Sequence, residues 1–266
     1  MNSVPEKLKA FERLLTIMDD LREKCPWDKK QTMHSLRHLT IEEVYELADA
    51  IIEDDKKEIK KELGDILLHI VFYARIASES GDYDIADVIN SLCEKIIHRH
   101  PHIYGDPDNN GKLVTVADDE EVSRNWEKLK LKEGTTSVLQ GVPVSLPAII
   151  KSMRIQEKAR AAGFDWERKE QVWEKVEEEM QEFKNEVEAG EKEKAEREFG
   201  DVLFALVNYA RFQNINPEEA LERTNKKFIR RFQYLEQSVI TNNQKLSEMT
   251  LDEMDVYWNE AKAKGL

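Results

Sequence analysis

Four acidic residues in the second half of the chain have the types and spacing of a metal site. Glu179 and Glu182 lie three residues apart, and so do Glu198 and Asp201. On a helix this spacing places both side chains on one face, so two neighbouring helices would bring four carboxylates together. Such a group repels itself unless a cation binds there. Because all its ligands would be oxygens, we expect Mg2+, or alternatively Mn2+, rather than zinc or copper.

The first half of the chain repeats this pattern. Each second-half acid lies 136 positions after a first-half counterpart, although the residues between the acids have largely diverged. The corresponding metal-ligand candidates in the first half are Glu43, Glu46, Glu62 and Asp65. The sequence therefore predicts an internal duplication with one carboxylate group in each half.

A solvated, glutamate-rich helix face is the ordinary alternative in a chain of which 35% of the residues are charged. Two features argue against it. The apolar run at 202–207 predicts a helix buried almost all round, which would carry its carboxylates into the interior. Gly64 and Gly200 lie inside these helices, where glycine costs about 1 kcal/mol relative to alanine. We therefore expect a neighbouring group to approach the backbone closely at both glycines.

Composition limits the kind of protein. The net charge of −14 disfavours binding to a nucleic-acid polymer or to a membrane surface, since both need basic residues. Cys25 and Cys93 are the two cysteines, which supports neither a disulfide framework nor a thiolate metal site. There is no signal-like N-terminus and no apolar run of membrane-spanning length. We expect a cytoplasmic protein.

Helices must position the acidic residues, and the pattern predicts an all-α protein of two homologous helical bundles. Amphipathic spacing predicts a first helix at 8–21, and Thr40 with Glu43 could cap the next, unless that helix begins near Ser35. In the second half Asn216, followed by Pro217, predicts another helix start. We expect a long loop at 102–119 and a short helix around Trp126. The turn-rich segment 133–147 predicts the boundary, which gives domains at 1–135 and 136–266.

Four segments together resemble one known family. They are the EExxE motif at 42–46 and 178–182, paired with the ExxD motif at 62–65 and 198–201, and the segments Cys25-Pro-Trp-Asp28, His98-Arg-His-Pro-His102 and Gly163-Phe-Asp-Trp166. Over nearly the whole chain they look like MazG, the tandem-domain nucleoside triphosphate pyrophosphohydrolases of the all-α superfamily. The resemblance implies a Mg2+-dependent dimeric enzyme. It would hydrolyse nucleoside triphosphates between the α and β phosphates to a monophosphate and pyrophosphate.

The resemblance also assigns roles to side chains. It gives metal binding to the four second-half acids that the spacing already indicates. Lys194, Lys227 and Arg231 match cationic positions of the family, where they would neutralise the leaving pyrophosphate, and a solvated helix face is the alternative for the last two. Glu178 is a further carboxylate that could activate the attacking water. Trp166 could stack on a base, although a tryptophan at a helix start is more often a core anchor.

Two other classes of protein compete with this reading. A di-iron carboxylate bundle would need Glu-x-x-His on its helices, where this chain has Glu-x-x-Asp. All six histidines lie in the first half, so a histidine-ligated metal shared by both halves is excluded. A non-catalytic acidic binding or regulatory module is the remaining alternative, but it would not need matching inward carboxylates in both halves.

The two halves differ in charge near their acidic motifs. Glu58 occupies the position that matches Lys194, so a cation before one ExxD motif is an anion before the other. An added negative charge should weaken triphosphate binding. We therefore expect the second half to carry most of the activity and the first to be a weaker, regulatory or structural copy.

Overall fold

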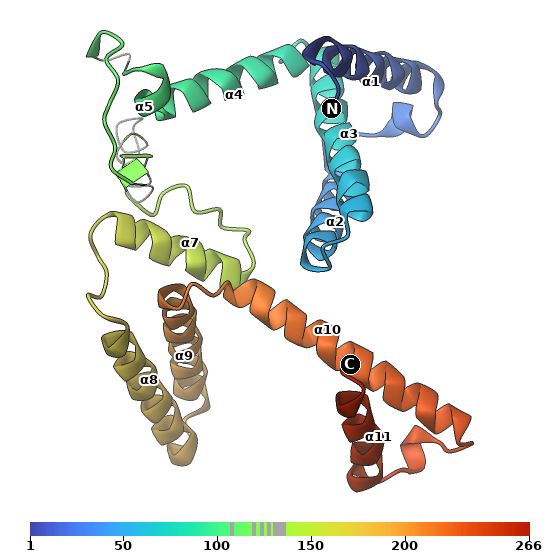
Figure 1. The fold of residues 1–266 in the computed structure, drawn as a ribbon, viewed down its shortest axis with the longest axis vertical. Helices are drawn as coiled ribbons and strands as arrows, with labels where there is room; N and C mark the ends of the chain where they lie inside the picture. The colour runs from blue at the N-terminus through green and yellow to red at the C-terminus, as the bar shows by residue number, and fades with distance from the viewer. Residues whose placement is uncertain (107–108, 119–120, 123–124, 127–128, 130–136) are drawn as a thin grey trace. The chain divides into compact units, whose positions relative to one another are not determined.

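The computed structural model describes residues 1–106, 109–118, 121–122, 125–126, 129 and 137–266. They form two compact units, 1–117 and 118–266. The described parts contain helices and a single isolated bridge between Asp106 and Lys112, so the all-α prediction is confirmed (Figure 1). The boundary predicted after residue 135 lies outside the described residues, as does much of the helix expected around Trp126.

The first unit consists of helices joined by short turns. Its elements are α1 (Val4–Lys24), the 3-10 turn η1 (Asp28–Lys30), α2 (Met33–Ile52), α3 (Lys56–Ser80), α4 (Ile85–Arg99) and α5 (Pro101–Tyr104). Asp55 caps α3, because its carboxylate accepts hydrogen bonds from the backbone N–H groups of Lys57 and Glu58. Helix α5 interrupts the predicted loop.

Helix α2 begins earlier than the Thr40 cap predicted. Thr32 caps it instead, and its hydroxyl accepts a hydrogen bond of 3.1 Å from the backbone N–H of Ser35. Thr40 lies inside the helix, where its hydroxyl bonds to the Leu36 carbonyl and, at 2.7 Å, to the Tyr73 hydroxyl of α3. The helix therefore begins close to the alternative start near Ser35, directly after the η1 turn.

The second unit repeats the order of helices. Its described elements are α7 (Ala148–Ala161), α8 (Lys169–Ala189), α9 (Lys192–Phe212), α10 (Pro217–Thr241), the 3-10 turn η3 (Leu246–Glu248) and α11 (Leu251–Ala263). A turn at Gly190, whose φ of 74° is left-handed and suits glycine, joins α8 to α9. Asn216 caps α10 as predicted. The α8–α9 hairpin corresponds to the α2–α3 hairpin, and both stand out in Figure 1.

A small apolar core joins α1 to the α2–α3 hairpin in the first unit. Met18, Leu36, Val71 and Phe72 are its fully buried members, and each is at most 2% exposed. They come from three helices, so burying them fixes α1 against the hairpin.

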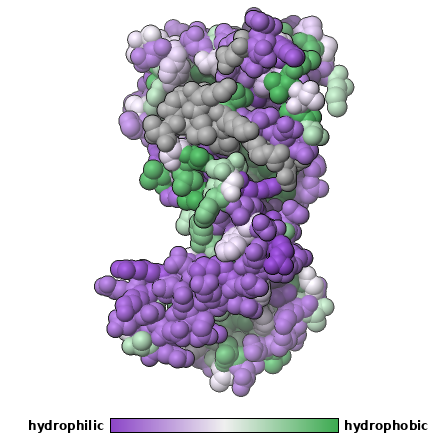
Figure 2. Space-filling model, turned by 90° about the vertical axis from the view of Figure 1, so that its left-hand side faces the viewer, coloured by the Kyte–Doolittle hydropathy of each residue, from purple (hydrophilic) through white to green (hydrophobic). Residues whose placement is uncertain are grey.

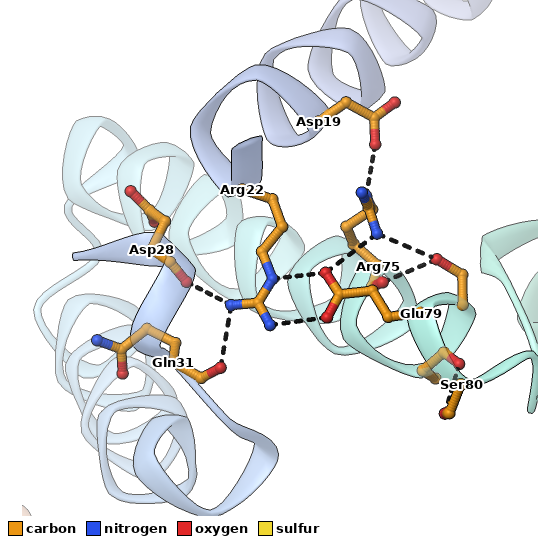
Figure 3. Close-up of polar contacts among 9 residues, drawn as sticks. Asp19, Arg22, Asp28, Gln31, Arg75, Glu79 and Ser80 are labelled. Carbon is orange, nitrogen blue, oxygen red and sulfur yellow. Dashed lines mark hydrogen bonds and ion pairs between the residues drawn. The ribbon is translucent and has the colours of Figure 1, made fainter. Parts of the chain in front are cut away.

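An arginine network closes the same side of the first unit (Figure 3). The Arg22 guanidinium binds Glu79 with two hydrogen bonds of 2.7 and 2.9 Å and also donates to the carbonyls of Asp28 and Gln31. Arg75 of α3 donates to Asp19 of α1 at 2.6 Å and to Glu79 at 3.2 Å. These contacts tie α1 and η1 to α3, with the bidentate pair as the strongest of them.

The apolar side chains of the hairpins are less buried than the sequence predicted. Leu203, Phe204 and Leu206 of α9 are 40–47% exposed, so this helix is not buried all round within one chain. Several exposed positions match between the halves at the 136-residue offset. They are Val44 with Met180, Ile51 with Val187, Leu63 with Phe199, Leu67 with Leu203 and Ile70 with Leu206.

The expectation about the two helical glycines is also wrong for the chain by itself. A Cβ atom added at Gly64 or at Gly200 would meet nothing within 4 Å among the described residues. Both glycines therefore border open space, next to the exposed apolar faces.

Among the described helices, none combines the length and the apolar character that a membrane crossing requires.

Candidate functional site

Three of the four second-half candidates come together. Glu179 and Glu182 of α8 and Glu198 of α9 each offer a carboxylate oxygen, and these oxygens lie within 4.8 Å of one another. Glu179 is 8% exposed, and Glu182 faces solvent. The α8–α9 hairpin brings these three carboxylates together, because the turn at Gly190 lets the acidic face of α8 pack beside the start of α9.

Asp201 lies beside this triad without belonging to it. Asp201 and Glu179 line the same cavity. The pKa of Glu198 is raised, first by partial burial and then by the charges of Glu182, Asp201, Glu179 and Glu186. The other three predicted acids therefore lie close enough to Glu198 to affect its pKa. Glu186, which the sequence reading did not single out, extends the acidic row by one helical turn beyond Glu182.

A lysine that the sequence reading missed meets the triad. Lys175 donates hydrogen bonds to Glu179 at 2.8 Å and to Glu178 at 2.9 Å, and these bonds raise its pKa. Lys175 lies four residues before Glu179, so the helical pairing rule could have found it. The candidate water-activating group, Glu178, is an exposed side chain held by this lysine.

The first-half acids form a similar triad. Carboxylate oxygens of Glu43, Glu62 and Asp65 lie within 4.8 Å of one another. Glu46 is outside the triad, but burial and the charges of Asp65 and Glu46 raise the pKa of Glu43. Lys61 donates to Glu62 at 2.7 Å, which lowers the pKa of that carboxyl group. Each triad therefore has a lysine bound to one of its members.

Both triads fit a divalent cation. All candidate ligands are carboxylate oxygens, the donors that Mg2+ and Mn2+ prefer. Glu62 is completely buried, and its Oε2 atom has no hydrogen-bond partner among the described residues. A buried carboxylate oxygen without a partner is costly, and a bound cation would satisfy it.

The predicted cations on α9 and α10 are placed differently from one another. Lys194 extends toward α8, where its Nζ atom lies 3.9 Å from the Glu186 carboxylate. Lys227 is exposed, and Arg231 donates a hydrogen bond of 2.6 Å to the Leu266 carbonyl and lies over the Trp258 ring. Neither Lys227 nor Arg231 lines the cavity that holds Glu179 and Asp201. Helix α10, which carries both of these cations, diverges from the α8–α9 hairpin in Figure 1.

A cavity of about 590 Å³ adjoins the second-half triad. Trp166 lies at its wall and is 43% exposed, so it is not the core anchor of the alternative reading. The preceding Asp165 accepts hydrogen bonds from Arg211 of α9 at both of its carboxylate oxygens, one of them at 2.9 Å, and this pair holds the Gly163-Phe-Asp-Trp166 segment against the hairpin. An aromatic side chain, carboxylates and a lysine therefore share one cavity.

The outer face of α8 is hydrophilic. In Figure 2 the lower part of the view, where α8 lies nearest to the viewer, is covered mostly by hydrophilic residues. Glu177 and Glu188 are exposed on this helix. The solvated-face reading therefore applies to some of the glutamates of α8, while Glu179 turns inward to the triad.

Comparison with known proteins gives one consistent result. A family model described as the MazG nucleotide pyrophosphohydrolase domain matches residues 31–104 and again 167–235. The chain is 42% identical over 257 residues to "Nucleoside triphosphate pyrophosphohydrolase/pyrophosphatase MazG" of Thermotoga maritima, covering 95% of each chain. It is 37% identical over 264 residues to the "Nucleoside triphosphate pyrophosphohydrolase" of Escherichia coli K12, covering 96% of this chain and 98% of that protein.

A third relative is longer than this chain. The uncharacterized protein YabN of Bacillus subtilis is 47% identical over 258 residues, which are 95% of this chain and 51% of that protein. The two matches of the domain model confirm the duplication that the sequence predicted.

Proposed function

Because this chain belongs to the MazG nucleotide pyrophosphohydrolase family, we propose that it hydrolyses nucleoside triphosphates between the α and β phosphates, releasing a nucleoside monophosphate and pyrophosphate. The observation that carries the proposal is the second-half triad, whose oxygens lie within 4.8 Å of one another. Glu179, Glu182, Glu198 and Asp201 would hold Mg2+, with Mn2+ as a substitute. The metal, when bound, would neutralise phosphate charge and polarise the phosphoryl group.

The remaining roles belong to side chains of the chain itself. In the proposed reaction water attacks the α phosphorus, the bond to the bridging oxygen breaks, and pyrophosphate leaves. Glu178 accepts the proton of the attacking water. Lys194, Lys227 and Arg231 neutralise the charge that develops on the pyrophosphate. Trp166 stacks on the base at the wall of the cavity.

We propose that the enzyme acts as a homodimer, because the exposed apolar positions of both hairpins are matched and need a partner. Since neither Lys227 nor Arg231 lines the cavity beside the triad, we propose that these cations reach the substrate from the second copy. A complementation experiment tests this: Glu198→Gln and Arg231→Ala chains, each inactive alone, should recover activity when mixed as heterodimers. Absence of recovery in verified heterodimers would place the cations and the triad of one chain in the same site.

The bond that is cleaved can be tested by identifying the first products. A panel of ribonucleoside and deoxyribonucleoside triphosphates is incubated with Mg2+, and the products are separated by anion-exchange chromatography. We expect monophosphate and pyrophosphate from the start of the reaction, and no turnover with a chelator or in Glu182→Gln. Diphosphate and orthophosphate as the initial products would contradict attack at the α phosphate.

A further inference from the structure

The cavity beside the second-half triad has two chemically distinct parts. Glu179 and Asp201 contribute carboxylates, and Phe164, Trp166 and Phe204 contribute aromatic surface. A triphosphate whose phosphates lie at the carboxylates would have its nucleoside close to the aromatic part. The cavity volume of about 590 Å³ is in the range of small-molecule sites. Among its lining residues, Gln156 of α7 and Asn208 of α9 carry side-chain amides.

Gln156 presents an unused acceptor. The side chain is 7% exposed, and its Nε2 atom donates a hydrogen bond of 2.8 Å to the Phe204 carbonyl. This bond fixes the orientation of the amide, because a carbonyl can receive only the nitrogen end. The Oε1 atom is buried and has no partner among the described residues. Such an atom keeps its desolvation cost until a donor reaches it.

Asn208 presents the opposite group. Its Oδ1 atom accepts hydrogen bonds from Arg211, at 3.1 Å from Nε and 2.9 Å from one terminal nitrogen. Arg211 is in turn held by Asp165, so the orientation of the Asn208 amide is fixed as well. Its amide nitrogen donates no hydrogen bond to another described residue and remains available as a donor.

We propose that Gln156 and Asn208 bind the edge of the nucleobase, with Gln156 accepting a base N–H and Asn208 donating to a base nitrogen or carbonyl oxygen. This inference rests on the proposed function, since it takes a nucleoside triphosphate as the ligand. Each common base has a donor and an acceptor side by side on its pairing edge. The pair therefore admits all of them and selects against bases whose edge N–H is replaced by a methyl group. Such a base would leave Gln156 Oε1 unpaired.

The first half supplies a natural replacement for Gln156. Met18 lines a groove with Val71 and Arg75, and Gln156 lines a groove with Val207 and Arg211. The valines and the arginines match at the 136-residue offset, so Met18 occupies the place of Gln156. A Gln156→Met variant thus introduces the residue that the first half has at the corresponding position. Methionine is similar in length to glutamine but has no amide oxygen to accept a hydrogen bond.

The experiment compares uridine triphosphate with its N3-methyl analogue, which lacks the edge N–H. We expect the wild type to prefer uridine triphosphate by about 10- to 100-fold in kcat/KM. Gln156→Met should lose about tenfold on uridine triphosphate and almost nothing on the analogue, so the preference collapses. Gln233→Met, an exposed position on α10, is the matched control and should keep the wild-type preference. Gln156→Ala is a second variant with the same expectation, should the methionine variant not fold.

The possible results separate this inference from the proposed function. Equal rates of the wild type on both nucleotides, or an unchanged preference in both Gln156 variants, would overturn the inference while the enzyme remains active. If the wild type released pyrophosphate from no nucleotide, the proposed function would fail. Calorimetric binding of the same two nucleotides would then still decide the role of Gln156, because the preference should appear in the dissociation constants.

Discussion

The two halves of the chain have kept the same carboxylates and have filled the space beside them differently. In the second half, Ala205 and Asn208 line the cavity next to the triad. Their counterparts at the 136-residue offset are His69 and Phe72, and these larger side chains are buried. Phe72 packs in the core with Met18, which replaces Gln156. The first half has therefore used for its own packing the side chains that, in the second half, border an open cavity.

This difference teaches that metal ligands alone do not make two sites equivalent. A triad with a buried, unpartnered oxygen at Glu62 can hold a cation, but a nucleoside also needs room next to it. We therefore expect the first half to bind metal and to contribute stability, and the second half to bind the base. The following predictions test this division, in order of the size of the expected effect.

The largest difference should appear in matched substitutions of the two triads. Glu179→Gln should lower kcat/KM by roughly 10³-fold, because it removes charge that would hold the metal. Glu43→Gln, at the corresponding position, should leave most of the pyrophosphate release intact. Both variants are assayed at saturating Mg2+, with circular dichroism to verify the fold. The division of roles would be reversed if Glu43→Gln were the inactive variant.

Substitutions in the first-half core and at the second-half cavity should differ in their effect on the free energy of unfolding. Phe72→Ala should destabilise the first unit by about 3–5 kcal/mol, because it leaves a hole in a buried core. Asn208→Ala should cost less, about 1–2 kcal/mol, because it removes the two hydrogen bonds that Arg211 donates to Asn208 but leaves no hole in a packed core.

Hydrogen exchange of peptides from α1–α3 and α7–α9 measures both effects in the full chain. Loss of protection on Asn208→Ala as large as that on Phe72→Ala would mean that the second-half cavity is a packed core as well.

A smaller effect should follow from charge near the triads. Lys194→Glu should lower kcat/KM about tenfold, since it places an anion beside Glu186 and the phosphate site. Glu58→Lys should change the rate less than twofold, because it lies in the half that we expect not to turn over substrate. Steady-state kinetics over a range of Mg2+ concentrations gives both values. A gain of activity in Glu58→Lys would show that charge, rather than space, silences the first half.

The smallest effect concerns the arginine network of the first unit. Arg22 lowers the pKa of Glu79, so the pair stabilises the fold above the ordinary pKa of glutamate and loses this contribution as the pH falls through the folded-state value. Glu79→Gln should be less stable than the wild type by about 1 kcal/mol at pH 7, with Glu79 partly exposed. Urea unfolding should show this difference shrinking toward pH 3. A difference that stays constant with pH would contradict an ionic origin.

Much of the fold follows from local rules that operate within a few residues. The Asn216 cap and the meeting of Glu179 with Glu182 and of Glu62 with Asp65 depend on helical spacing, and the structure shows these features. The prediction from the apolar run at 202–207 was wrong, because an apolar pattern does not determine whether its side chains are buried within the chain, and Leu203, Phe204 and Leu206 are exposed. The prediction for Gly64 and Gly200 was wrong because no other described residue approaches either glycine.

The two side-chain amides that we propose to bind the nucleobase could not be predicted from the sequence. Gln156 and Asn208 belong to different helices, and their meaning depends on how α7 packs against α9. A glutamine on an amphipathic helix is ordinary until its oxygen proves to be buried without a partner. The Lys175 pairing with Glu179, by contrast, was within reach of the spacing rule.

The lysines bound to the triads have a consequence for how the protein is made. Lys61 and Lys175 give each acidic cluster an internal counter-ion. We therefore expect a newly synthesised chain to complete both hairpins before it binds a divalent ion, unlike small zinc domains whose folding depends on the metal. If the metal is needed for catalysis as proposed, its supply would then control when the enzyme works rather than whether it folds, and a shortage would leave a folded but inactive protein.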